Sequence, residues 1–347
     1  MYSLEELTAI LGLIDEPAVA EKDGAIAAMN GAAEKLLGDQ RGLGLERLAE
    51  GAFPERLEPG MTAAVKLRSG PALLRSSCLG GYMVYRIRPD EPEKRPENEQ
   101  KLLSDMRSLL MSARMAANRL CENNEDERLD STLRILQHSH SSLWRLVFNN
   151  GLVDSAENGS LACDMIPQDL VIIGRDIVRT TNYFAKRRGV RLEFSSRERE
   201  VYVKGDNVLL ETMVLNLLSN SLESVGEGGS VKLSVSKTDK SGIIGVDDDG
   251  AGLAPEQVPE QLRGGDEGRS SGLRLVRDLA ELHGGTLVLG GSPGKGTSAR
   301  IMLPLLGTEG MVFMSPRAIY SFGGIDVVMS QLSKWLSSED YDPRLFD

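Results

Sequence analysis

The chain has 347 residues, of which 41% are hydrophobic and 26% are charged, and its formal net charge is −11. This balance is typical of a globular protein with room for two or three domains. An acidic chain is repelled by phosphate backbones, and the short basic cluster at residues 186–188 does not offset this, so we expect no direct nucleic-acid binding.

The cysteines and the N-terminal sequence indicate where in the cell the protein is expected. Cys78, Cys121 and Cys163 are far apart and lack metal-ligand spacing, which predicts reduced thiols in a cytosolic protein. The acidic N-terminus has no basic region followed by an apolar run, and no segment reaches the roughly 18 apolar residues of a spanning helix. We therefore expect a cytoplasmic protein without membrane insertion.

Residues 1–88 are predicted to form a first, mixed α+β domain. Strands are expected at residues 14–20, 24–29, 63–67 and 82–87. Asn30 is placed to cap a helix over 32–37, which Gly38 ends. The order strand, turn, strand, followed by N-x-A-A-E-x-L-L-G, resembles the opening of PAS sensor domains. A small module used for dimerisation is the alternative.

Residues 89–100 contain three prolines and are otherwise almost entirely polar, which indicates a linker. Residues 101–155 then predict two helices with apolar stripes at spacings of three and four. The stripes are Leu103, Met106, Leu110, Ala113, Ala117 and Leu120, then Leu129, Leu133, Leu136, His140, Leu143 and Val147.

The connection between these helices, residues 121–128, is short and polar, so we expect an antiparallel hairpin. A two-helix hairpin cannot bury its stripe alone. We therefore predict a homodimer through residues 101–155, with a four-helix bundle at its centre. Packing of the hairpin on the domain that follows is the alternative.

Residues 163–305 mix helical and strand patterns, which predicts an α/β sandwich with one mixed sheet faced by helices. Helices are expected at 170–184, 208–225 and 273–282, and strands at 191–194, 201–203, 230–237, 243–247, 286–289 and 299–303.

Four motifs follow one another in this domain. They are the helix segment 215–223 with two asparagines, D-x-G-x-G at 248–252, the glycine segment 268–273 and the G-K-G-T segment 294–297. In this order they resemble the ATP-binding domain of sensor histidine kinases, within the ATPase family shared with gyrase and Hsp90. The resemblance covers residues 98–305 and implies ATP and Mg²⁺ as cofactors.

The resemblance assigns roles to the first two motifs. Asn216 and Asn220 lie four apart on one helical face, with Asn220 as the Mg²⁺ ligand and Asn216 beside the phosphates. Glu223 stands where many histidine kinases have a basic residue. Asp248 is assigned the hydrogen bond from the exocyclic amine of adenine. Gly250 and Gly252 let the backbone turn beneath the base.

The last two motifs are assigned to the nucleotide through Gly268, Gly272, Leu273, Gly296 and Thr297. The helix that opens at Gly272 offers free N–H groups to a phosphate. Ser270 and Ser271 replace a glycine and a leucine of the family pattern, so we expect nucleotide binding under a small lid and leave turnover open. His283, at the end of that helix, is expected to complement the helix dipole.

The phosphoacceptor motif of the family, H-E-x-x-[TN]-P-L, aligns with residues 104–110, which read S-D-M-R-S-L-L. Ser104 takes the place of the histidine and Leu109 that of the proline. A serine hydroxyl needs a base and forms a stable ester, so a phosphoserine is a poor donor to a response-regulator aspartate.

Three interpretations remain open. In the first, the chain is an ATP-binding scaffold, or a response-regulator phosphatase that uses Asp105 and Ser108 to hold a water. In the second, His138 is the acceptor, whereas His140 lies on the apolar stripe and is expected in the core. In the third, the chain phosphorylates a serine on a partner, as anti-sigma kinases of the same ATPase family do; the helical hairpin argues against this.

Residues 306–347 extend beyond the resemblance. Helical spacing predicts one helix, carried by Ile325, Val328, Leu332, Trp335 and Leu336. We expect this helix to pack on the ATP-binding domain, with docking of a partner as the alternative. The acidic run 338–342 is expected to be mobile.

Overall fold

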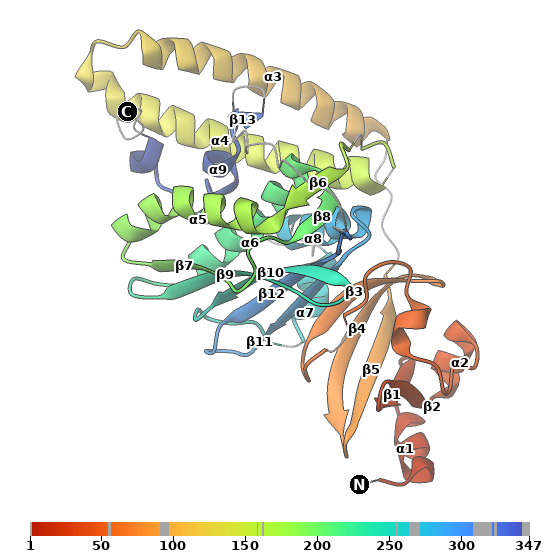
Figure 1. Ribbon diagram of the computed structural model, residues 1–347. Coiled ribbons are helices and arrows are strands. Elements are labelled where there is room, and N and C mark those ends of the chain that lie inside the picture. The colour runs from red at the N-terminus through yellow and green to blue at the C-terminus, as the bar shows by residue number, and fades with distance from the viewer. Residues whose placement is uncertain are drawn as a thin grey trace.

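The structure is a computed structural model that describes residues 2–54, 57–90, 97–157, 159–161, 163–254, 256–263, 271–307, 321–322 and 325–341. It confirms the α+β class. Figure 1 shows a long helical hairpin at one end, a sheet covered by helices in the middle and a smaller strand-rich part at the N-terminal end.

The N-terminal part contains five antiparallel strands in the order β2-β1-β5-β4-β3. They are β1 (Ala18–Lys22), β2 (Ala25–Met29), β3 (Thr62–Leu67), β4 (Gly70–Leu79) and β5 (Tyr82–Pro89). Asn30 caps α2 (Gly31–Leu37) as predicted, because its Oδ1 accepts a hydrogen bond from the amide of Ala33 at 2.9 Å. The remaining elements, which the periodicity missed together with β4, are α1 (Leu4–Leu11) and the 3-10 helix η1 (Leu45–Leu48). The PAS-like assignment stays a prediction.

The C-terminal domain continues the same sheet. Its strands follow β3 in the order β11 (Thr286–Gly291), β12 (Thr297–Pro304), β10 (Ser241–Asp248), β9 (Ser230–Lys237) and β7 (Arg191–Ser196). Only the β7–β9 pair is parallel among these neighbours. A separate two-stranded sheet joins β6 (Ile166–Asp169) to β8 (Tyr202–Gly205), and β6 was not predicted.

The junction of the two parts is the antiparallel pairing of β3 with β11, in which Ala64 lies opposite Leu287 and Thr62 opposite Leu289. Nearby, the Thr286 hydroxyl donates to the carbonyl of Ala52 at 2.8 Å, and Arg277 forms a buried ion pair with Asp90. Residues 1–88 therefore share one ten-stranded sheet with the C-terminal domain, which the strand patterns did not predict.

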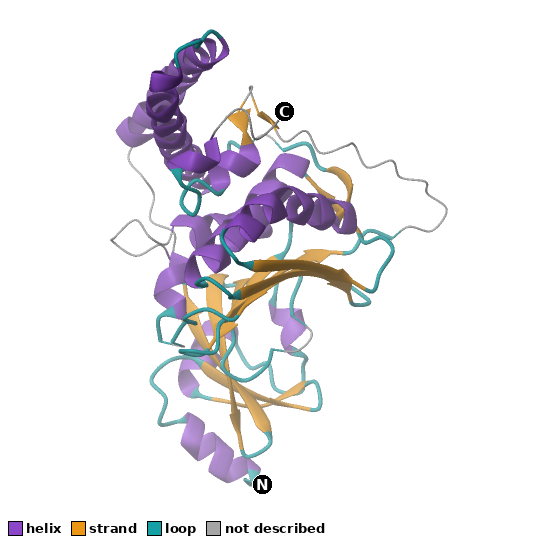
Figure 2. Ribbon diagram, turned by 90° about the vertical axis from the view of Figure 1, so that its left-hand side faces the viewer, coloured by secondary structure: helices purple, strands orange, loops and turns teal. Residues whose placement is uncertain are grey.

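Helices cover one face of the C-terminal sheet (Figure 2). They are α5 (Leu170–Arg187), α6 (Asn207–Ser224) and α8 (Ser271–Leu282), with the short α7 (Val258–Arg263) beside α8. Asp169 caps α5 by accepting from the amide of Val171, and Asp206 caps α6 by accepting from the amides of Val208 and Leu209. Helix α6 is buried along almost its whole length, because it lies between the sheet and the other helices.

The predicted hairpin is formed by α3 (Glu97–Glu122) and α4 (Glu127–Glu157), which fold back on each other. Helix α4 also packs on α8, which is the contact named above as the alternative to a dimer. The apolar stripe of α3 divides between two faces: Ala117 is buried in the hairpin, whereas Met106 and Leu120 are exposed. An apolar outer face thus remains in the single chain.

The C-terminal extension packs between the hairpin and the C-terminal domain. It contains β13 (Ser321–Phe322), β14 (Ile325–Asp326), α9 (Val327–Gln331) and the 3-10 helix η2 (Ser338–Tyr341). The predicted helix is shorter than its apolar spacing indicated, because turns follow Gln331. The apolar residues after that point are buried nevertheless.

The prediction that the acidic run is mobile was wrong for residues 338–341. Asp340 is buried and accepts hydrogen bonds from Arg188 and from the amide of Ser337, both at 2.9 Å. The Tyr341 hydroxyl donates to the carbonyl of Met329 at 2.7 Å. A carboxylate paired with a guanidinium can be buried, which composition alone does not show. Asp342 lies outside the described residues. Across the described part of the chain, no helix combines the length and apolar character needed to span a membrane.

Candidate functional site

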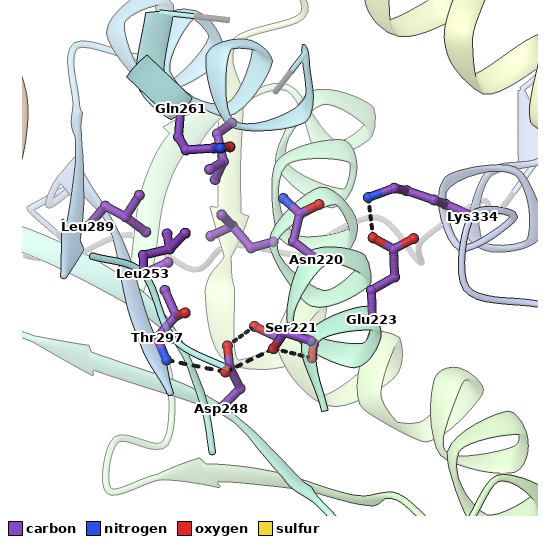
Figure 3. A pocket seen from close by; sticks show the side chains of 14 residues that line it. Asn220, Ser221, Glu223, Asp248, Leu253, Gln261, Leu289, Thr297 and Lys334 are labelled. Carbon is purple, nitrogen blue, oxygen red and sulfur yellow. Dashed lines mark hydrogen bonds and ion pairs between the residues drawn. The ribbon is translucent and has the colours of Figure 1, made fainter. Parts of the chain in front are cut away.

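A cavity of about 330 Å³ lies between α6, the end of β10, the start of α8 and β12 (Figure 3). One part of its wall is apolar, formed by Leu217, Leu253, Leu273, Leu289 and Ala299. The other part carries Asn220, Ser221, Asp248 and Thr297. An apolar wall beside the Asp248 carboxylate suits a heteroaromatic ring that carries an amine. The structure thus brings Asn220, Asp248, Gly252, Leu273 and Thr297 of the predicted site together.

Asp248 ends β10 and is held in place by four hydrogen bonds. Its Oδ1 accepts from the hydroxyl of Ser224 at 3.0 Å and from the amides of Gly250 and Thr297 at 3.0 and 3.2 Å. Its Oδ2 accepts from the hydroxyl of Ser221 at 2.8 Å. Because one described donor reaches Oδ2, that oxygen keeps a lone pair for a donor inside the cavity.

The glycines of the site allow close backbone contacts around this carboxylate. Gly252 has φ +72°, and a Cβ there would lie 2.0 Å from the carbonyl oxygen of Ser292. Gly296 has φ +81°, and its Cβ would lie 1.7 Å from the carbonyl oxygen of Asp248. A side chain at either position would push the last motif away from the cavity. A Cβ at Gly250 would lie 2.3 Å from the hydroxyl oxygen of Ser224.

The side chains of Asn216 and Asn220, which belong to α6, lie beside the N-terminal end of α8. A Cβ at Gly272 would lie 3.0 Å from Asn216 Oδ1 and 3.7 Å from Asn220 Nδ2. Asn220 lines the cavity, and no described residue forms a hydrogen bond with its side chain. An amide oxygen at this place fits the hard oxygen donors that Mg²⁺ prefers, with water and phosphate as the other ligands. Gly268 lies outside the described residues.

Asn216, by contrast, is buried in an amide network that the sequence did not predict. Its Nδ2 donates to Gln331 Oε1 at 3.1 Å and to the carbonyl of Thr212 at 2.8 Å, and its Oδ1 accepts from Asn149 Nδ2 at 3.2 Å. Gln331 Nε2 donates in turn to Asn149 Oδ1 at 2.9 Å. The network joins α4, α6 and the C-terminal extension. A place for Asn216 beside phosphates stays a prediction.

The hairpin residues of the predicted chemistry are exposed. Ser104, Asp105 and Ser108 lie on α3, and the Ser108 hydroxyl donates to the carbonyl of Ser104 at 3.2 Å. None of the described residues that line the cavity lies on α3. A role for these residues therefore requires movement of the hairpin or contact with another molecule.

All three histidines are engaged within the chain. His138 Nε2 lies 3.0 Å from the carbonyl oxygen of Ser333, and its ring packs against Tyr341. His140 is buried as expected, with Nε2 2.8 Å from the carbonyl of Leu110, and burial lowers its pKa.

His283 is neutral rather than a charged partner of the helix dipole. Its Nδ1 donates to the carbonyl of Leu279 at 2.7 Å, and its Nε2 accepts from the amide of Asp206 at 3.2 Å. A carbonyl can only accept and an amide can only donate, which fixes the neutral Nδ1–H tautomer. Burial also lowers the pKa of His283. His283 thus meets the C-terminal end of α8 as a neutral donor to a carbonyl of the last turn rather than through a positive charge.

Two charged residues at the cavity mouth complete the site. Glu223, at the end of α6, forms an ion pair with Lys334 of the C-terminal extension (Figure 3). Sequence reasoning singled out Glu223 only as a departure from the family pattern and did not find Lys334. The residues that support Asp248 were also missed; Ser221 and Ser224, three apart on the asparagine helix, were the available signal.

Comparison with known proteins agrees with this geometry. Residues 205–307 match the family model described as histidine kinase-, DNA gyrase B- and HSP90-like ATPase. The chain is 37% identical over 127 residues to the histidine protein kinase DivJ of Caulobacter vibrioides, which covers 34% of this chain and 21% of that protein. It is 27% identical over 223 residues to the sensor protein kinase PmrB of Pseudomonas aeruginosa, which covers 60% of this chain and 46% of that protein. The matched regions span less than half of either relative.

Among solved structures, the fold is similar to full-length ShkA in complex with AMPPNP, with a TM-score of 0.52 and 23% identity. The similarity covers 60% of this chain and 46% of ShkA. At this identity it shows a shared fold alone. The family match at 205–307 contains Asn220, Asp248 and Thr297, and it excludes both the hairpin and Lys334.

Proposed function

This chain is a histidine-kinase-like protein, and from that premise we propose that its C-terminal domain binds ATP with Mg²⁺ as part of a two-component signalling system. The observation that carries the proposal is the carboxylate of Asp248, which four hydrogen bonds fix at the wall of an apolar cavity. We expect Oδ2 to accept from the exocyclic amine of adenine, and the leucine side chains of the cavity wall would contact the ring.

The phosphates would extend from this slot toward Asn220 and the N-terminus of α8. Free N–H groups at a helix N-terminus favour an anion, and an amide oxygen with water and phosphate completes a magnesium shell. Bound Mg²⁺ would neutralise phosphate charge at Asn220. Gly272, which lies against both asparagines, lets the helix approach closely.

We propose further that the chain does not phosphorylate itself on a histidine. The position aligned with the phosphoacceptor is Ser104, and each of the three histidines is bonded or buried within the chain. The protein then acts as a nucleotide-responsive scaffold for a response regulator. Exposure of Asp105 and Ser108 favours one second candidate, removal of phosphate from that regulator.

We extend the proposal to the domain that would receive a signal and to the surface that would join two copies of the chain. The N-terminal domain is proposed as a PAS-like sensor, and the outer face of the hairpin as the surface that joins two copies. An apolar face left uncovered in one chain supports this assembly.

Nucleotide binding is tested by calorimetry on the full chain with Mg²⁺ and ATP. Loss of the Asp248 charge should weaken binding, because a buried hydrogen bond to a charged group contributes about 1.5–3 kcal/mol. We expect Asp248→Asn to lower ATP affinity by at least about tenfold. Asp249→Asn, next to it on the loop, is the matched control and should bind as the wild type does. Absence of ATP binding by a folded wild-type chain would overturn the proposal.

The acceptor is tested with γ-labelled ATP. We expect no acid-labile label on the wild-type chain, because Ser104 occupies the acceptor position. Acid-labile label that disappears in His138→Ala would establish a histidine acceptor and refute the scaffold. Acid-stable label that disappears in Ser104→Ala would instead indicate serine chemistry.

A further inference from the structure

Within the matched region 205–307, the described charged residues that line the cavity are acidic, so they would repel the phosphates of a nucleotide. The positive charge comes from outside that region. The charged side chains among the described lining residues of the cavity are those of Glu223, Asp248 and Lys334. Two are acidic, whereas ATP carries several negative charges. Lys334 is therefore the cation that the described lining offers to a polyphosphate.

Lys334 is held at the cavity by the packing of its neighbours. Leu332, Trp335 and Leu336 are buried, so the backbone on both sides of the lysine is anchored. The guanidinium of Arg188 lies over the Trp335 ring, 4.8 Å from its centroid. The lysine side chain itself is about one-third exposed and extends toward α6 (Figure 3).

The partner of Lys334 lies beside the proposed magnesium ligand. Glu223 is three residues after Asn220, so both project from neighbouring positions on α6. Figure 3 shows the Lys334 amine at Glu223 with Asn220 next to them on the same side of the cavity. A lysine amine has three donors on a flexible stem, so it can keep a carboxylate contact while it donates to a second anion.

We propose that Lys334 of the C-terminal extension binds the phosphate groups of the nucleotide, and that Glu223 holds the lysine at the cavity mouth. This inference rests on the proposed function and deepens it, since it adds a phosphate-binding residue from outside the matched region 205–307. The same segment carries Gln331, which joins Asn216 and Asn149. A nucleotide held by Lys334 is thereby connected to helix α4 of the hairpin.

The test compares ATP, ADP and adenosine, each titrated with Mg²⁺ into the full chain. Lys334→Gln should weaken ATP binding by about tenfold, as expected for one charge-assisted hydrogen bond. ADP should weaken by less, and adenosine by less than about twofold, because it has no phosphate. Lys334→Arg should retain most of the ATP affinity.

Lys237→Gln is the matched control. Lys237 forms a surface ion pair with Glu198 at 3.2 Å and does not line the cavity, so this variant should bind all three ligands as the wild type does. Equal melting temperatures for the two variants verify that the fold is intact.

Each other outcome overturns the inference in its own way. Unchanged ATP affinity in Lys334→Gln would show that the lysine does not reach the phosphates. An equal loss for adenosine and ATP would show that it only supports the cavity wall. If the wild-type chain binds adenosine but not ATP, the cavity does not accept phosphate groups and the proposed role of Lys334 is refuted. A wild type that binds none of the three would refute the proposed function itself.

Discussion

Glu281 lies on α8 near the ion pairs at the junction of the two sheet halves. The pKa of Glu281 is raised to about 7: burial is the largest cause, Arg277 opposes it, and the neighbouring Asp278 and Asp90 add to it. The Arg277 guanidinium forms ion pairs with both aspartates, so its positive charge is not available to Glu281 alone. A proton on Glu281 relieves the excess of negative charge at this site.

This proton predicts a pH dependence of stability. The folded-state pKa lies above the ordinary value of 4.5, so the folded chain binds the proton more tightly than the unfolded chain does. The stabilisation is complete below about pH 4.5 and is lost as the pH rises through about 7. We expect Glu281→Gln to be more stable than the wild type at pH 8 by about 1–3 kcal/mol, since one pKa unit is about 1.4 kcal/mol and the side chain is partly exposed.

Urea unfolding at pH 5 and pH 8 measures this difference. Glu5→Gln, at an exposed position of α1, is the control and should follow the wild type at both values. Equal stability of Glu281→Gln and the wild type at pH 8 would show that the carboxylate is not destabilised in the fold.

At the scale of single residues, the sequence singled out residues that line the candidate cavity but not the residues that support them. Asp248 and Asn220 could be singled out because their motifs are local and follow one another in a fixed order, and their roles stay predictions. Lys334 and Gln331 were not found, because each meets α6 across more than 100 residues of chain. A polar glutamine at the end of an apolar helix was a signal that its amide has a buried partner.

At the scale of elements, the hairpin was predicted but its faces were not. Spacing alone placed Leu110 and Met106 on one stripe, although Leu110 contacts the core and Met106 is exposed. The division arises because α4 packs on α8 as well as on α3. The exposed large apolar residues in the described part of the hairpin are Leu102, Met106, Leu109, Met115, Leu120, Leu129, Ile135, Leu136, Leu143 and Leu146.

This outer face predicts self-association. Leu109 is 70% exposed and Leu143 is 49% exposed, on α3 and α4 respectively. If these two leucines contact a second copy of the chain, glutamates in their place would be buried at the interface without charged partners, which costs free energy. We expect the wild type to have about twice the chain mass of 37.7 kDa in sedimentation, and the Leu109→Glu/Leu143→Glu variant to have the single mass.

Leu13→Glu is the control for this experiment. Leu13 is 85% exposed in the N-terminal part, far along the sequence from the hairpin, so its substitution should leave the mass unchanged. A wild-type chain that sediments at the single mass over a wide concentration range would contradict the dimer.

At the scale of the whole molecule, the main departure from the sequence analysis is the continuous sheet. The polar, proline-containing segment 89–100 indicated two independent units, and local patterns placed most strands within a few residues. Pairing of β3 with β11 joins residues more than 200 positions apart, and no period in the sequence encodes such a register. The strand order therefore required the three-dimensional structure.

The β3–β11 pairing also has a consequence for fragments of this protein. Leu287, Val288 and Leu289 are buried beside β3. A fragment that starts at α3 would lack β3 and present these three residues on an open strand edge, with backbone groups ready to pair with any other extended chain. We therefore expect a fragment that starts at α3 to aggregate more readily than the full chain, because β3 covers this edge in the full chain.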